Sequence, residues 1–151
     1  MRVLFVCTGN SCRSVMAEGL LRKILTDMKI ENVKVESAGT STIPGYKPAL
    51  ETVEVMFEHD IDVSGHRTML LNKHLVDAVD LIFTATRQHH DAVLKISPQA
   101  ASKTFTMCPE GVLDPIGMPI EEYRKSFRQI KGCMDKIMKK ILHQIQKKSG
   151  N

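Results

Sequence analysis

The sequence predicts a single α/β domain, residues 1–151, built on a parallel sheet. Short apolar runs alternate along the chain with stretches of helical periodicity, and this alternation is typical of parallel strands joined by helices. A loop of small residues joins the first apolar run to the first helical stretch. The sequence has no internal repeat, low-complexity segment or linker that would divide it, and 151 residues suit one domain.

Four segments have the length and composition of strands. Arg2–Cys7 is apolar after its first residue, which is typical of a strand buried on both faces. Residues 33–37 alternate between apolar and polar side chains and end in the turn signal Ala38-Gly39. Residues 80–84 and 103–107 complete the predicted set.

Helical periodicity appears between and after these strands. Residues 17–28 carry apolar side chains at helical spacing, and residues 47–58, 70–78 and 88–96 are shorter predicted helices. The last helix has the clearest pattern, because its apolar residues recur at steps of three and four and form one stripe. These residues are Ile120, Tyr123, Phe127, Ile130, Met134, Ile137, Ile141 and Ile145.

Composition excludes several classes of protein. The net charge of +4 is too small for a nucleic-acid-binding signature, although it suits acidic or phosphorylated substrates. No segment approaches the roughly 20 apolar residues that span a membrane, and the N-terminus does not resemble a secretory signal. We therefore expect a cytoplasmic protein whose four cysteines are thiols. The histidines lack metal-ligand spacing, so we expect surface or helix-cap roles for them, and neither a metal nor a cofactor.

The loop after the first strand has the composition of a phosphate-binding loop. It reads Thr8-Gly9-Asn10-Ser11-Cys12-Arg13-Ser14. Such a loop can turn several backbone N–H groups toward one point, and the following helix adds the positive end of its dipole. Arg13 contributes a planar two-pronged donor suited to phosphate. Cys7 would lie beneath the anion, in surroundings that favour a nucleophilic thiolate, so the pattern indicates covalent phosphoryl transfer.

A second chemical group is expected from the loop before the last helix. Asp114 lies in a segment bounded by glycine and proline, between the fourth strand and the last helix. In a parallel sheet, functional loops gather at the carboxyl ends of the strands, where Cys7 also lies. Cleavage of a phosphate monoester requires protonation of the leaving group, and a carboxylic acid above the site can supply that proton. An Asp-Pro pair is more often only a turn, but beside the Cys7 loop we favour a general acid.

Taken together, these motifs resemble the low-molecular-weight protein tyrosine phosphatase family. The matching segments are Cys7 to Ser14, Ala17-Glu18, Ser37-Ala38-Gly39 and Asp114-Pro115, in the family's order. The resemblance implies three layers, with a four-stranded parallel sheet between helices and the phosphate-binding loop after the first strand. It implies that Cys7 is the nucleophile, Arg13 the phosphate clamp and Asp114 the general acid. It also implies that Ser14 steadies the thiolate and that Asn10, with Ser37, maintains the loop's shape.

Two departures from the usual family pattern concern the substrate. Ile116 follows the Asp-Pro pair, where many relatives carry an aromatic residue that packs on a phenol ring, and Ser11 replaces a branched apolar residue. A small hydroxyl residue such as Ser11, together with the Val-Leu-Asp-Pro-x-Gly run, resembles the protein arginine phosphatases of the family. Ser11 is compatible with a guanidinium leaving group, because such a group needs hydrogen-bond partners. Tyr46 could instead supply an aromatic wall. Phosphotyrosine and phosphoarginine proteins therefore both remain candidate substrates, and phosphate, vanadate and arsenate are expected inhibitors.

Two other functions would also use a phosphate-binding loop of this kind. Thiol-dependent arsenate reductases resemble this loop closely, but they need two further cysteines near the third strand, and residues 81–96 contain none. A phosphoprotein-binding module without catalysis is disfavoured because Cys7 and Asp114 are both present.

Cys12 is a candidate redox partner of Cys7. It lies in the same tightly curved loop and could capture an oxidised Cys7 as a disulfide, which would protect the nucleophile from irreversible oxidation. The alternative is that Cys12 only fills space beneath the loop.

Overall fold

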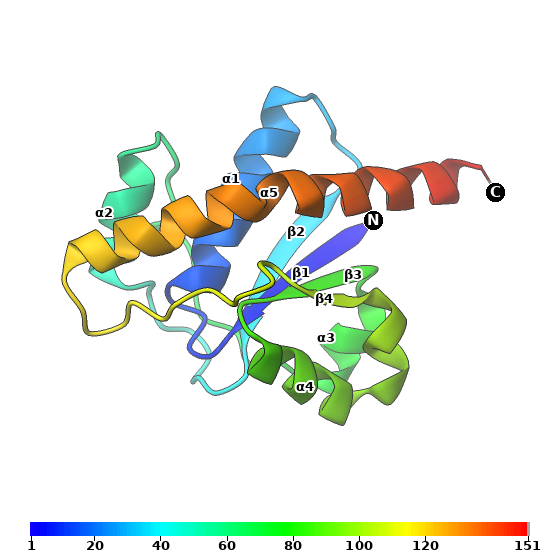
Figure 1. Ribbon diagram of the computed structural model, residues 1–151, viewed down its shortest axis with the longest axis horizontal. Coiled ribbons are helices and arrows are strands. Elements are labelled where there is room, and N and C mark those ends of the chain that lie inside the picture. The colour runs from blue at the N-terminus through cyan, green and yellow to red at the C-terminus, as the bar shows by residue number, and fades with distance from the viewer. Residues whose placement is uncertain (151) are drawn as a thin grey trace.

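Four parallel strands form one sheet in the order β2-β1-β3-β4 (Figure 1). The computed structural model describes residues 1–150, and its strands are β1 Arg2–Cys7, β2 Lys34–Gly39, β3 Leu81–Thr84 and β4 Thr104–Thr106. Central strand β1 pairs with β2 on one side and β3 on the other, so its apolar run is buried. The predicted α/β architecture and all four predicted strands are confirmed, with ends displaced by at most two residues.

Alternate side chains of β1 supply two separate cores. Val3 and Phe5 face the core under α1, Arg13–Asp27, and α5, Ile120–Ser149, which lie on one face of the sheet with α2, Leu50–Phe57. Leu4 and Val6 face the opposite core, under α3, Lys73–Ala78, and α4, Arg87–Ile96. A short 3-10 helix, Pro98–Lys103, leads into β4. The helices therefore form the two outer layers of the fold.

The last helix has the predicted stripe, and most of it is buried. Tyr123, Phe127, Ile130, Met134, Ile137 and Ile141 all lie in the core shared with α1. Lysines occupy the exposed side of α5. No helix among residues 1–150 combines the length and the apolar character needed to cross a lipid bilayer.

Helix starts differ from the predicted ones for local reasons. Helix α1 begins at Arg13, inside the predicted loop, because the Cys12 carbonyl already accepts the Met16 N–H. Helix α2 begins after Pro48, since a residue before proline is disfavoured in helical geometry. Helix α3 begins at Lys73 because the Asn72 side chain caps it by accepting the Leu75 N–H at 2.9 Å.

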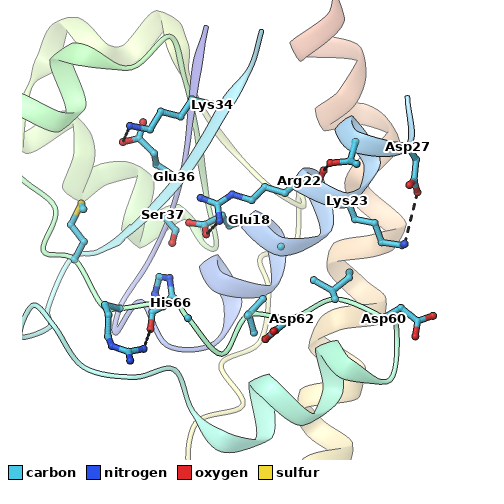
Figure 2. A pocket seen from close by; sticks show the side chains of 17 residues that line it. Glu18, Arg22, Lys23, Asp27, Lys34, Glu36, Ser37, Asp60, Asp62 and His66 are labelled. Atoms are coloured by element: carbon cyan, nitrogen blue, oxygen red, sulfur yellow. Dashed lines mark hydrogen bonds and ion pairs between the residues drawn. The ribbon is translucent and has the colours of Figure 1, made fainter. Parts of the chain in front are cut away.

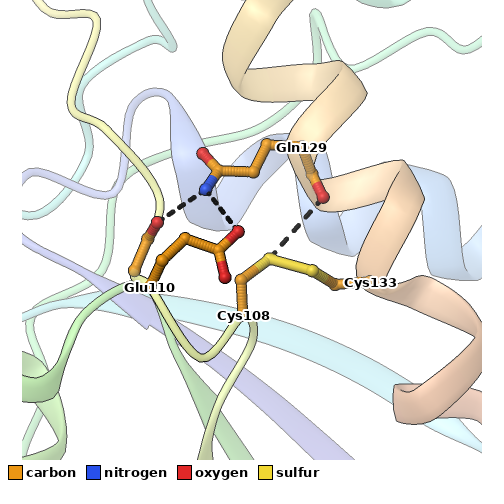
Figure 3. The surroundings of a disulfide bond; sticks show 5 residues. Cys108, Glu110, Gln129 and Cys133 are labelled. Atoms are coloured by element: carbon orange, nitrogen blue, oxygen red, sulfur yellow. Dashed lines mark hydrogen bonds between the residues drawn. A yellow bond between two sulfur atoms is a disulfide. The ribbon is translucent and has the colours of Figure 1, made fainter.

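The prediction that every cysteine is a thiol is wrong for Cys108 and Cys133, which form a disulfide (Figure 3). Cys108 follows β4 and Cys133 lies in α5, with Cα atoms 5.7 Å apart. The prediction relied on the expectation that the protein is not secreted, and that expectation carries no information about which side chains α5 brings to the end of β4. Cys7 and Cys12 are free, as expected.

Removing this disulfide should lower stability without removing the site. The bond joins residues 25 positions apart, and closure of a loop of that length contributes about 3 kcal/mol to the free energy of unfolding. Urea unfolding of the wild type should lose about this much on addition of a reductant. Cys133→Ser should be equally weakened and insensitive to the reductant. An unfolding midpoint of the wild type that ignores the reductant would contradict the prediction.

Candidate active site

Cys7 and Arg13 lie at the two ends of the loop that joins β1 to α1. Cys7 is the last residue of β1 and is buried, and Arg13 is the first residue of α1. The residue before the helix, Cys12, makes no side-chain hydrogen bond to the first-turn N–H groups. Those donors, with the positive end of the helix dipole, are available to an anion.

Asn10 sets the shape of this loop. Its backbone is left-handed, with φ of 53°, a conformation that asparagine tolerates better than most residues. Its buried side chain donates from Nδ2 to Ser14 Oγ at 2.8 Å and to Ser37 Oγ at 2.9 Å. Its Oδ1 accepts the Met69 N–H at 2.9 Å. The structure thus joins Asn10 and Ser37, the two side chains expected to maintain the loop, to Ser14 and to the backbone of Met69.

The end of β2 and a histidine from a later loop lie directly behind the phosphate-binding loop. A Cβ atom at Gly39 would lie 2.5 Å from the Thr8 carbonyl oxygen, so only glycine fits there without displacement. His66 donates from Nε2 to the Asn10 carbonyl at 2.9 Å. Sequence reasoning missed His66, because no spacing relates position 66 to Cys7.

Ser14 offers an oriented donor to Cys7. The Cys7 Sγ and Ser14 Oγ atoms are 2.9 Å apart, and both residues are buried. Because Ser14 Oγ already accepts from Asn10 Nδ2, its own proton is free to point at the sulfur. This arrangement suits a cysteine that carries negative charge.

Arg13 is anchored on one side and open on the other. Its Nη1 donates to the Val112 carbonyl at 3.0 Å, and its Nη2 lies 3.4 Å from Thr8 Oγ1 and 3.4 Å from Asp114 Oδ2. Arg13 Nε is buried and has no hydrogen-bond partner among residues 1–150. A buried guanidinium N–H without a partner is costly unless the site receives an acceptor, and the residue is placed to bind one.

Asp114 reaches this site from the loop between β4 and α5. Its Oδ1 accepts the Ile116 N–H at 3.1 Å, which fixes the carboxylate in a local turn. The preceding carbonyl, that of Leu113, accepts from Ser126 Oγ in α5 at 2.9 Å. The side chain is 42% exposed, so it can exchange protons with solvent.

A cavity of about 120 Å³ opens between these two loops. Ser11 and Ile116 line it, whereas Asn10 and Ser14 are fully buried and do not. Tyr46 is exposed and lies outside the lining, with its backbone paired to Thr68. The complete lining is Cys7, Thr8, Gly9, Ser11, Cys12, Arg13, Asp114 and Ile116.

A larger cavity, about 680 Å³, lies between α1, β2 and the segment 60–69 (Figure 2). Its charged side chains largely pair with one another, as in Arg22 with Glu18 and Lys34 with Glu36. Its lining includes neither a cysteine nor any residue of the phosphate-binding loop. Of these two cavities, the small one over Cys7 is therefore the candidate active site, because it joins a nucleophile to the phosphate-binding loop.

Within residues 1–150, one group has the spacing of metal ligands, namely Cys108, Glu110 and Cys133. The two sulfur atoms are bonded to each other, so a single carboxylate remains as a ligand. Gln129 Nε2 donates to that carboxylate at 3.0 Å. The group thus anchors the start of the Asp114 loop to α5.

The chain matches the family model described as low molecular weight phosphotyrosine protein phosphatase over residues 2–150, and it belongs to that family. It is accordingly a cysteine-dependent protein phosphatase.

Known relatives include more than one activity. A protein-arginine-phosphatase of Geobacillus stearothermophilus is 33% identical over 146 residues, which cover 93% of this chain and 95% of that protein. An arsenate reductase of Staphylococcus xylosus is 36% identical over 129 residues, covering 85% and 89% of the two chains. A solved structure of the YwlE arginine phosphatase, a cysteine-to-serine mutant with a phosphorylated active-site serine, superposes with a TM-score of 0.86 at 31% identity, covering 93% and 95%.

The close approach of Gly39 to the loop can be tested directly. Gly39→Ala should push the Thr8 carbonyl away and lower kcat/KM for p-nitrophenyl phosphate on the order of a hundredfold, as a misplacement of about 1 Å can. Gly132→Ala is the matched control, because a Cβ there meets nothing within 4 Å, and it should keep full activity. Equal activity of the two variants would contradict this account.

Proposed function

We propose that this protein removes phosphate from arginine side chains of proteins, with Cys7 as nucleophile, Arg13 as clamp and Asp114 as general acid. The observation that carries the substrate preference is the lining of the small cavity, which contains Ser11 and Ile116 but no aromatic side chain. A phenol ring would find no flat wall there. A guanidinium group would find oxygen acceptors on Ser11 and Asp114.

The first half of the reaction forms an S–P bond. The Cys7 thiolate attacks phosphorus while loop amides and Arg13 hold the equatorial oxygens. The buried Arg13 Nε, which has no hydrogen-bond partner within residues 1–150, supports this role for the guanidinium. The P–N bond of phosphoarginine, or the P–O bond of phosphotyrosine, breaks as Asp114 donates its proton to the leaving atom. The products at this point are phosphocysteine and the free arginine or tyrosine side chain, which carries the proton from Asp114.

The second half restores the enzyme. The Asp114 carboxylate takes a proton from water, the water oxygen bonds to phosphorus, and the S–P bond breaks to release phosphate and the Cys7 thiolate. The phosphorylated active-site serine of the related YwlE mutant supports covalent transfer to the residue at the position of Cys7. Phosphate, vanadate and arsenate should compete for the same cradle.

The arsenate-reductase alternative receives less support. Electron transfer would require two further cysteines near the third strand, and residues 81–96 contain none. Cys108 and Cys133 are bonded to each other and do not line the small cavity. Phosphotyrosine remains the second candidate substrate, favoured by the family to which the chain belongs.

A paired assay tests the substrate. The reduced protein should release phosphate at least tenfold faster from a phosphoarginine protein than from a phosphotyrosine peptide, about 1.4 kcal/mol of discrimination. Ser11→Ile should reverse or abolish the preference, because it removes a hydroxyl from the lining. Cys7→Ser is the control and should show no turnover on either substrate. A phosphotyrosine preference of the wild type, or a phosphoarginine preference that survives Ser11→Ile, would overturn the assignment.

Mild oxidation tests the proposed partnership of Cys7 and Cys12. Both line the small cavity, and burial raises the pKa of the Cys12 thiol, so Cys12 remains a thiol when the Cys7 thiolate meets peroxide. Peroxide oxidises Cys7 to a sulfenic acid, and attack by Cys12 then forms the disulfide and releases water. We expect the inactivation to be reversible on addition of a reductant. In the cell a reducing compartment would restore activity, and we propose the cytoplasm as that compartment. Cys12→Ser should become irreversibly inactivated. Mass spectrometry that finds no Cys7–Cys12 link would refute the proposal.

A further inference from the structure

His89 is a buried histidine at the active-site edge that the reaction described above does not use. It lies in the first turn of α4 with 6% of its surface exposed. The ring contacts two different loops. Its Nδ1 faces Thr86, which caps α4, and its Nε2 lies 2.8 Å from Oγ1 of Thr8 in the phosphate-binding loop. The cap contact was within the roles expected for the histidines, whereas the contact with Thr8 was not.

The contacts of Nδ1 determine where the ring proton resides. The Thr86 backbone N–H donates to Nδ1 at 3.1 Å. A backbone N–H is always a donor, so Nδ1 must be unprotonated to accept it. The proton of the neutral ring is therefore on Nε2, where it can only be donated to Thr8 Oγ1.

Thr8 Oγ1 receives a second donor. Arg13 Nη2 lies 3.4 Å from it, which with His89 Nε2 accounts for both acceptor positions of the hydroxyl. The Thr8 proton must then point away from both donors. Because the Thr8 side chain is exposed and lines the small cavity, that proton is available to an oxygen of a bound anion.

The charges around the ring support its neutral form. Burial and the positive charge of Arg13 lower the pKa of His89 to about 4, with the negative charge of Asp114 acting in the opposite direction. Since this pKa lies below the usual 6.5 of histidine, the imidazole stays neutral above pH 5. Its unprotonated Nδ1 therefore remains able to accept the Thr86 N–H.

We propose that His89 is a positioning residue, which donates from Nε2 to Thr8 Oγ1 and so directs the Thr8 hydroxyl toward phosphate and holds Arg13 Nη2 in place. Among residues 1–150, the other side chain that contacts Thr8 Oγ1 is Arg13, which is itself the group that His89 holds in place through Thr8. The proposal rests on the proposed role of Arg13 and the loop as the phosphate cradle.

Two substitutions separate this role from the helix cap. His89→Asn keeps an acceptor near the position of Nδ1 but has no group that reaches Thr8. His89→Gln places an amide N–H near the position of Nε2 but loses the Nδ1 cap. We expect His89→Asn to raise the inhibition constant of inorganic phosphate and the KM for p-nitrophenyl phosphate about two- to tenfold, the effect of one hydrogen bond. We expect His89→Gln to restore both constants while lowering the melting temperature.

A double-mutant cycle with Thr8→Val tests whether the two residues act together. If His89 acts through Thr8, His89→Asn should add little to the effect of Thr8→Val on the phosphate inhibition constant. Fully additive effects would overturn the proposal. So would a wild-type inhibition constant in His89→Asn, or a kinetic defect in His89→Gln as large as that in His89→Asn.

A measurement without turnover keeps this proposal separate from the proposed function. Long-range ¹H–¹⁵N correlation spectra of the wild type should show the Nε2–H tautomer of His89, unchanged from pH 7 to pH 5.5. A proton on Nδ1, or titration of the ring near pH 6.5, would contradict the proposal even in an active enzyme. An inactive protein with the expected tautomer and with phosphate binding weakened by His89→Asn would instead count against the proposed function alone.

Discussion

The left-handed backbone at Asn10 is the constraint on which the rest of the site depends. This conformation costs an L-residue about 1 to 2 kcal/mol. The Asn10 side chain offsets that cost through hydrogen bonds with Ser14, Ser37 and Met69, each contributing about 1 kcal/mol. One of those bonds also orients Ser14 toward Cys7, so the element that curls the loop also orients the donor beside the sulfur.

The parallel sheet brings the other parts of the site to the same edge. Cys7, Gly39 and Ala85 lie at the carboxyl ends of adjacent strands or directly after them. The Ala85 carbonyl accepts the Val112 N–H at 2.8 Å, which ties the start of the Asp114 loop to the end of β3. Residues distant in sequence therefore meet over Cys7 because strand direction, rather than local spacing, places them there.

Most of the fold and the main chemical groups could be predicted from sequence, because local patterns encode them. An apolar run, a loop of small residues and a helical stripe can each be recognised from residues that lie close together in the sequence. The same reasoning missed the contacts of His66 and His89, since a histidine carries no local sign of which loop will lie beside it. It also missed the disulfide, whose two cysteines meet only because α5 packs beside the end of β4.

The residues expected to determine the substrate were predicted only in part. Ser11 and Ile116 could be identified by their departure from a family pattern, and both line the small cavity. Tyr46 was a candidate aromatic wall because it follows the second strand. Its position outside the lining depends on how the loop between β2 and α2 folds back on Thr68.

Arg13 takes its main anchor from the carbonyl oxygen of Val112, a backbone atom that every amino acid possesses. Most side-chain substitutions in the loop that carries Asp114 should therefore leave the position of the Arg13 guanidinium unchanged. Exposed positions such as Leu113, Ile116 and Met118 can diverge while the clamp keeps its place. A lineage can thus acquire new substrates by small steps, each leaving the chemistry of phosphate intact.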